Sequence, residues 1–219
     1  MNKNLIIAIT SLFLFSFASA QNQQERAAEA KGNQLMMEAS QHIKSFRALK
    51  IFFSYDMENT SKNTKESMKG ELISQGDRYH MSLSGNLFIS DGTNTWTYLK
   101  DMNEVYINTL ANSEGGITPT SILNDFEGQF RAKHIRQETH MGRRVEIIDL
   151  VPRAPQLFYK YRVALDASTK MLVYTIAHDR EGSTYTYTMD RIETNPTIAA
   201  GQFTFSAANF PGIEVVDLR

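Results

Sequence analysis

The residue types that most often do chemistry are scattered in this chain, and their spacing matches no site. The five histidines are His42, His80, His134, His140 and His178. No two of them are four residues apart, as in a helical metal site, and there is no cysteine to complete one. The sequence lacks the glycine motifs of nucleophile elbows, phosphate loops and dinucleotide sites. Asp149 lies in a predicted strand with no second carboxylate placed beside it. We therefore predict no catalytic residue, no metal and no cofactor, and a protein that is not an enzyme.

The chemistry that remains is the binding of apolar molecules. Asp91-Gly92 and Asn94 separate two apolar runs, which is typical of a β-hairpin, and the second run carries the single tryptophan, Trp96. Alternation of apolar and polar residues along this and other strands predicts a sheet with one concave, hydrophobic face. Its expected lining is Ile51, Phe53, Tyr55, Leu72, Tyr79, Met81, Leu83, Ile89, Trp96 and Tyr98. Such a face is either packed against the hydrophobic core or binds a flexible apolar ligand. Methionine side chains suit such a ligand because they adapt their shape to it.

Period-two alternation over most of the chain predicts about ten or eleven strands. The expected strands are 51–57, 68–72, 79–83, 87–90, 95–99, 104–107, 143–150, 157–165, 172–176, 184–192 and 202–205. Short turns between successive strands indicate antiparallel pairing with one buried face. So many strands are expected to curl toward a barrel or half-barrel.

Two helices are expected to accompany the sheet. The first runs from about Gln23 to Phe46, and its apolar stripe is formed by Leu35, Ala39, Ile43 and Phe46. The second is short and carries Ile122, Leu123 and Phe126 on one face. It is either a plain cap on the core or a movable lid that plugs the open side of the half-barrel.

The N-terminal segment predicts an export signal. Lys3 precedes the apolar run Leu5–Phe17, and Ala18-Ser19-Ala20 has the pattern of a signal-peptidase site. We therefore expect a signal peptide at residues 1–20 and a single soluble, monomeric domain at residues 21–219. A net charge of −1 favours no nucleic-acid partner. Without cysteine the chain forms no disulfide and carries no lipid on a cysteine.

Several short segments, in this order and spacing, resemble the LolA family of periplasmic lipoprotein carriers. They are Gly70-Glu71-Leu72, Ile89-Ser90-Asp91-Gly92, Trp96-Thr97-Tyr98, Glu104-Val105, Pro119 with Ile122-Leu123, Asp149-Leu150-Val151-Pro152, Phe203-Thr204-Phe205 and Pro211-Gly212-Ile213-Glu214-Val215. The resemblance implies an incomplete antiparallel β-barrel with helices across its open side. It also implies a carrier that shuttles acylated lipoprotein cargo from an inner-membrane release complex to an outer-membrane acceptor.

The sequence departs from this family at one place, and two other classes stay open. The family often has an Arg-Pro pair after the Gly-x-Leu strand, whose Arg helps to hold the lid shut. Here the chain reads Ser74-Gln75-Gly76-Asp77-Arg78, with the arginine displaced. The alternatives are a periplasmic sensor module that binds lipids or mislocalised lipoproteins, and a secreted hydrolase.

Overall fold

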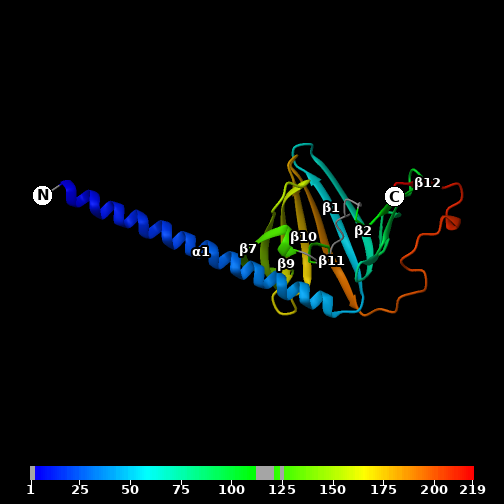
Figure 1. Cartoon of the computed structure of the whole chain (residues 1–219), viewed down its shortest axis with the longest axis horizontal. Helices are drawn as coiled ribbons and strands as arrows, with labels where there is room; N and C mark the ends of the chain where they lie inside the picture. Colours follow the sequence, from blue (N-terminus) through cyan, green and yellow to red (C-terminus); the bar gives the residue numbers. More distant parts are fainter. Residues whose placement is uncertain (1–2, 112–120, 124–125) are drawn as a thin grey trace.

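The chain is dominated by one curved sheet with a long helix packed on it, as seen in a computed structural model that describes residues 3–111, 121–123 and 126–219 (Figure 1). The strands are β1 (Leu49–Asn59), β2 (Thr64–Gln75), β3 (Arg78–Leu83), β4 (Asn86–Asp91), β5 (Asn94–Leu99), β6 (Glu104–Thr109), β7 (Phe130–His140), β8 (Arg143–Pro152), β9 (Phe158–Asp166), β10 (Leu172–Asp179), β11 (Ser183–Thr194) and β12 (Glu214–Asp217). The helices are α1 (Lys3–Ser45), the 3₁₀ turn η1 (Ser121–Leu123), α2 (Phe126–Gln129) and the 3₁₀ turn η2 (Ala207–Asn209).

The sheet consists of two meanders joined at its middle. Its order is β12-β6-β5-β4-β3-β2-β1-β11-β10-β9-β8-β7, so the joint is the pairing of β1 with β11. Neighbours are antiparallel except that β12 runs parallel to β6. The sheet curves without closing, and β12 and β7 form its two edges. This confirms the predicted class, a mainly β, incomplete barrel covered by helices.

The strand assignments needed three corrections. The sheet has twelve strands, including β7 and β12, which the sequence did not predict. Strand β7 is an edge strand rich in charged residues, such as the exposed Arg131 and Arg136 and the half-buried Glu138, and therefore shows no apolar alternation. The segment 202–205 forms no strand, because turns occupy its start: the Gln202 amide donates to the Ala199 carbonyl and the Thr204 amide to the Gly201 carbonyl, while Phe203 packs on Arg78.

Helix α1 covers one face of the sheet, which we call the inner face. Leu35, Ala39 and Ile43 of the predicted stripe are buried there together with Met36, whereas Phe46 is half-buried. These side chains share a core with Ile51 of β1 and with Leu72, Met81, Ile148 and Val163 from four further strands. Burying such an apolar stripe stabilises a helix far more than its own propensity does.

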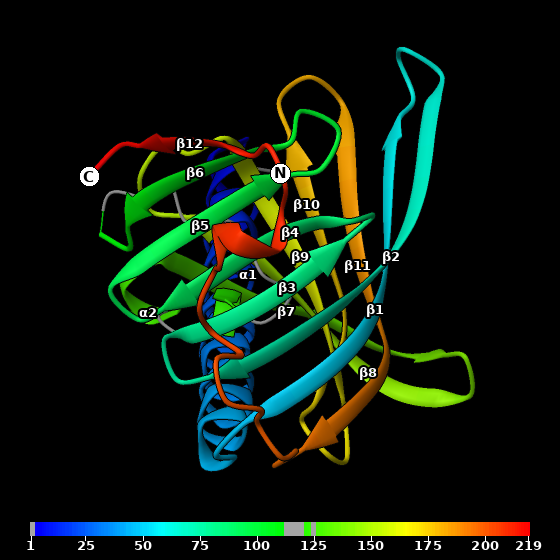
Figure 2. The same ribbon diagram turned by 90° about the vertical axis from the view of Figure 1, so that its right-hand side faces the viewer.

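The opposite, outer face is covered on one side of the sheet by the chain between β11 and β12. This tail segment (residues 196–213) crosses β3 to β6 (Figure 2). The ring of Tyr98 lies 4.4 Å from that of Phe210 and 6.0 Å from that of Phe205. The sheet therefore has a helix wing (β7–β11), covered on its inner face, and a tail wing (β3–β6 with β12), covered on its outer face.

Candidate functional site

The inner face of the central strands is a continuous apolar wall. Ile51 of β1 lies opposite Leu72 of β2, which lies opposite Met81 of β3, and all three are buried. Phe53 is buried on the same side, and its ring fills the space above Gly70, where a Cβ would lie 2.3 Å from the Phe53 ring. Cross-strand pairing thus brings these four predicted residues together.

Tyr55, Tyr79 and Leu83 extend this wall toward its borders. All three pack against the same core and remain half-buried. Tyr55 pairs with Tyr187 of β11, and Tyr79 pairs with Ser90 of β4. The seven residues nominated from β1, β2 and β3 therefore share the inner face, whereas their role in binding stays a proposal.

Ile89, Trp96 and Tyr98 lie on the outer face, so their assignment to the concave face was wrong. The tight turn at Ser84-Gly85 places Phe88, not Ile89, opposite the inward-facing Met81. Ile89 then pairs with Trp96 on the other side. Leu87, Phe88 and Ile89 are all apolar, so alternation could not distinguish the two phases; only the turn length decides.

The wall continues over β9 and β11 through aromatic residues that the sequence analysis did not nominate. Tyr187 lies 5.6 Å from Phe53 between ring centroids, and Tyr55 lies 5.0 Å from Tyr187. Phe158 contacts both Tyr161, at 5.7 Å, and Tyr185, at 5.2 Å. The alternation of Tyr185 and Tyr187 along β11 was a usable signal, but it became specific only once β11 was known to pair with β1.

Separate elements cover the wall. Ile122, Leu123 and Phe126, from η1 and α2, are 5%, 0% and 3% exposed and belong to the same core as Leu35 and Met36 of α1. They come from outside the sheet and contact it through side chains. In this structure the wall is therefore covered by the protein's own residues, and we call α1, η1 and α2 together the cover.

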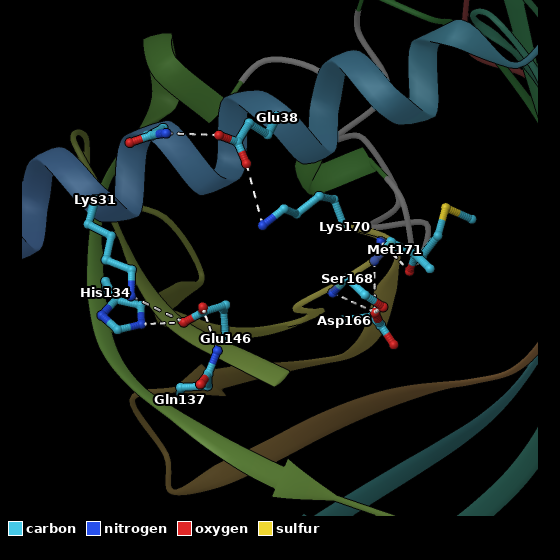
Figure 3. A network of polar contacts seen from close by, with 11 residues as sticks. Lys31, Glu38, His134, Gln137, Glu146, Asp166, Ser168, Lys170 and Met171 are labelled. Atoms are coloured by element: carbon cyan, nitrogen blue, oxygen red, sulfur yellow. Dashed lines mark hydrogen bonds and ion pairs between the residues drawn. The ribbon is translucent and has the colours of Figure 1, made fainter. Parts of the chain in front are cut away.

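A polar seam fastens α1 to the helix wing (Figure 3). Glu146 of β8 is 7% exposed, and its Oε2 lies 2.7 Å from His134 Nε2 and 3.4 Å from Lys31 Nζ on α1. The Gln137 amide donates to Glu146 Oε1 at 2.9 Å. Burial acts to raise the pKa of Glu146, but the His134 hydrogen bond and the Lys31 charge outweigh it and lower the pKa. The carboxylate is therefore ionised when α1 is seated.

Close backbone contact accompanies the seam. Gly32 of α1 lies directly on β7, where a Cβ would be 2.7 Å from the His134 amide nitrogen. Only glycine permits this approach without displacing the helix. The contact between Lys170 Nζ and Glu38 Oε2 is peripheral, since the two atoms lie 3.5 Å apart on the exposed side of the helix.

The family is identified by comparison with known proteins. The family described as outer membrane lipoprotein carrier protein LolA matches residues 44–206, about three-quarters of the chain. The chain belongs to the LolA family. No curated protein sequence matches it.

Solved structures similar to this LolA-family chain share its fold at low identity. An uncharacterised conserved protein from Thermus thermophilus has a TM-score of 0.58 and 9% identity, over 84% of this chain and 98% of its own. An outer-membrane lipoprotein-sorting protein domain from Vibrio parahaemolyticus reaches a TM-score of 0.47 at 13% identity, over 80% and 97% of the two chains. Lipoprotein LppX from Mycobacterium tuberculosis reaches 0.46 at 13% identity, over 79% and 98%. Of these three, only the Thermus structure is similar enough to support the fold.

The displaced arginine that distinguishes this chain from the LolA pattern contacts the tail segment rather than the cover. Arg78 donates to Gln75 Oε1 at 2.6 Å and stacks over Phe203 of the tail segment at 5.1 Å. The charged contacts that hold α1 instead include those of Lys31, Glu25 and Glu38. Pro119, part of the resemblance, lies outside the described residues.

Two open cavities lie beside the turn between β9 and β10 rather than beside the wall, and only the second is also lined by α1. They have volumes of about 540 and 560 Å³ and share Ser168 in the turn between β9 and β10. Their linings are polar, with Arg143 and Arg144 in one and Glu38 and His42 in the other. No group of three metal-ligating side chains, and no helix long and apolar enough to cross a membrane, occurs in the described part of the chain.

Proposed function

We propose that this LolA-family protein is a periplasmic carrier that binds the acyl chains of lipoproteins on its inner face and shuttles them from the inner to the outer membrane. Residues 1–20 would be removed as a signal peptide, and the mature chain would begin at Gln21. The partners would be an inner-membrane release complex and an outer-membrane acceptor. The observation that supports the proposal is the apolar wall whose cover is made by separate helices.

Energetic balance favours reversible exchange between cover and cargo. The three side chains Ile122, Leu123 and Phe126 together contribute roughly 5 to 9 kcal/mol when fully buried. An acyl chain that buries ten methylenes gains roughly 8 kcal/mol. Because the two quantities are similar, cargo can replace the cover and the cover can later expel the cargo.

Replacing Phe126 by Ala tests the cover. The variant is expected to bind a fluorescent diacylated peptide more tightly than the wild type, because a weaker cover competes less. Its free energy of unfolding is expected to fall by about 3 kcal/mol, since Phe126 is buried. Met102→Ala, at a position 63% exposed in a distant turn, serves as the control. Unchanged affinity and unchanged stability in Phe126→Ala would contradict a role as a lid.

Mass spectrometry of material that co-purifies with the periplasmic protein tests the cargo directly. A carrier is expected to retain acylated species, whereas a hydrolase would release free products from esters or glycosides. Recovery of the protein in an integral membrane fraction would contradict the proposed location.

A further inference from the structure

A group of hydroxyls interrupts the apolar inner face where β1, β11 and β10 meet. Tyr55 pairs with Tyr187, and Tyr187 pairs with Thr175, so the three form one cross-strand row. Tyr161 lies in the neighbouring row, opposite Ala177. We call Tyr55, Tyr161, Thr175 and Tyr187 the hydroxyl patch.

The patch contains one of the two buried side-chain polar atoms of the described residues that have no hydrogen-bond partner; the other is Nε2 of His178 on the same strand. Thr175 is 2% exposed, and its buried Oγ1 has no hydrogen bond. Among the described residues, no hydrogen bond is formed by the hydroxyls of Tyr55, Tyr161 or Tyr187 either. The neighbouring Tyr185 of β11, by contrast, donates to Asp179 at 3.2 Å. Since buried polar groups are nearly always paired, the unpaired Thr175 hydroxyl indicates a partner supplied from outside, and the three tyrosine hydroxyls beside it, which are not among the buried unpaired atoms, can reach the same partner.

The charged side chains around the hydroxyl patch limit which chemical groups of a ligand can bind there. The surrounding inner-face residues are apolar, including Met57, Met189 and Val163. The charged groups at its border are acidic: Glu66 lies opposite Met57, and Asp179 holds Tyr185. An anionic headgroup or free carboxylate would meet acidic side chains there, without a compensating cation on the described inner face of these strands.

The protonation of the tyrosines fits a donor role. Burial raises the pKa of Tyr55 to about 12, with smaller contributions from Tyr185 and Glu66, and burial raises the pKa of Tyr161 to about 12. The pKa of Tyr187 is also raised, mainly by burial. All three tyrosines therefore stay protonated and neutral at physiological pH. They can donate hydrogen bonds to a neutral acceptor on the ligand.

We propose that the hydroxyl patch hydrogen-bonds the ester carbonyl oxygens of the acyl cargo, so that the site selects ester-linked acyl groups over plain hydrocarbon. This inference rests on the proposed function, because it assumes that acyl chains lie on the inner face. The apolar wall would supply most of the affinity, and the patch would set the position of the ester end. A carbonyl oxygen is a much better acceptor than an ether oxygen, which provides a matched probe.

The experiment compares a dipalmitoyl-glyceryl peptide with its dihexadecyl ether analogue, which has the same peptide and chain length but no carbonyl. Wild-type protein is expected to bind the ester form about fivefold more tightly, as one or two net hydrogen bonds would give. Tyr187→Phe keeps the ring and removes the hydroxyl, and it is expected to lose most of this preference by weakening binding of the ester form much more than binding of the ether form. Thr175→Val is a second variant with the same expectation, and its free energy of unfolding is expected not to fall, because it removes an unpaired hydroxyl.

Tyr174→Phe is the matched control, since Tyr174 is the neighbour of Thr175 in β10 and faces the outer side of the sheet. It is expected to keep the full ester preference. Equal affinity of the wild type for the two peptides, or an equal loss for both in Tyr187→Phe, would overturn the inference while leaving the carrier function intact. If the wild type bound neither peptide, the proposed function would fail as well.

Discussion

The helix wing and the tail wing are built from similar meanders, but a distant segment covers the inner face of the first and the outer face of the second, and among the described residues only the helix wing has a second buried cluster on its other face, with Val145, Ile147 and Ala164. In the helix wing, α1 covers the inner face, so that Ile148, Leu150 and Val163 are inaccessible. In the tail wing, residues 196–213 cover the outer face, where Ile89 and Tyr98 are buried, while Phe88 on the inner face is only partly covered. The difference teaches that the faces a strand buries depend on the segments that pack on it as well as on its own alternation.

This difference separates stability from binding. The tail segment is part of the permanent fold, because its aromatic rings pack on Tyr98 and the chain that follows it extends the sheet as β12. In the proposed function, by contrast, the cover of the inner face is displaced when cargo binds. Substitutions on the two faces of one sheet should therefore have different consequences.

The largest effect is expected from Tyr98→Ala in the tail wing. Tyr98 is 7% exposed and contacts two phenylalanine rings, so its loss is expected to lower the free energy of unfolding by about 3 kcal/mol. Urea denaturation measures this change. Binding of a diacylated peptide to the folded variant is expected to be unchanged. Met81→Ala, on the inner face, is the counterpart and is expected to lose both stability and binding. A loss of binding in Tyr98→Ala would contradict the division between the faces.

A smaller effect is expected from Gly32→Ala on α1. The new Cβ would meet backbone atoms of Lys133 and His134 within 3 Å, which outweighs the gain in helix propensity. Such overpacking costs about 1 to 3 kcal/mol, and by loosening α1 it should raise the affinity for a diacylated peptide. Asn33→Ala, at the exposed next position, is the control and is expected to change neither quantity. Greater stability or weaker binding in Gly32→Ala would show that α1 is not part of the cover.

The smallest effect, confined to acidic pH, is expected from Glu146→Gln. The pKa of Glu146 is lowered in the folded state, so its contribution to stability is present above the ordinary carboxyl value of about 4.3 and is lost as pH falls through the folded value. The variant is therefore expected to show a shallower loss of stability in acid than the wild type. Thermal melts between neutral and acidic pH measure this slope. Glu38→Gln, which removes an exposed pair, should leave it unchanged. If stability fell equally steeply with falling pH in Glu146→Gln and in the wild type, the role of the polar seam would be contradicted.

The sequence was sufficient to predict the general architecture and about half of the residues that form the apolar wall. Clean alternation in β1, β2 and β3 identified inner-face positions such as Phe53 and Leu72, and turn chemistry marked the antiparallel order. The prediction failed where consecutive residues on both faces of a strand are apolar, as around Phe88 and Ile89. It also failed where an edge strand is rich in charged residues, as in β7. In those places, the face toward which each side chain points depends on the length of the preceding turn and on which distant segments pack on the sheet.

The polar seam and the hydroxyl patch were beyond sequence reasoning for a related reason. Lys31 and Glu146 are separated by 115 positions, and nothing local in either segment indicates that they meet. Tyr55 and Tyr187 become neighbours only through the β1–β11 joint. Contacts of this kind follow from topology, which a single sequence does not state.

That joint also constrains the order in which the molecule folds. Each meander consists of hairpins between consecutive strands, whose local contacts form quickly. Strand β1, although it is made first, cannot complete its second row of hydrogen bonds until β11 has emerged. Closing this long loop is the entropically costly step, so the two meanders are expected to form separately and to dock late. Until they dock, the unpaired edges of β1 and β11 are exposed, and this is the interval in which the chain is most prone to aggregate.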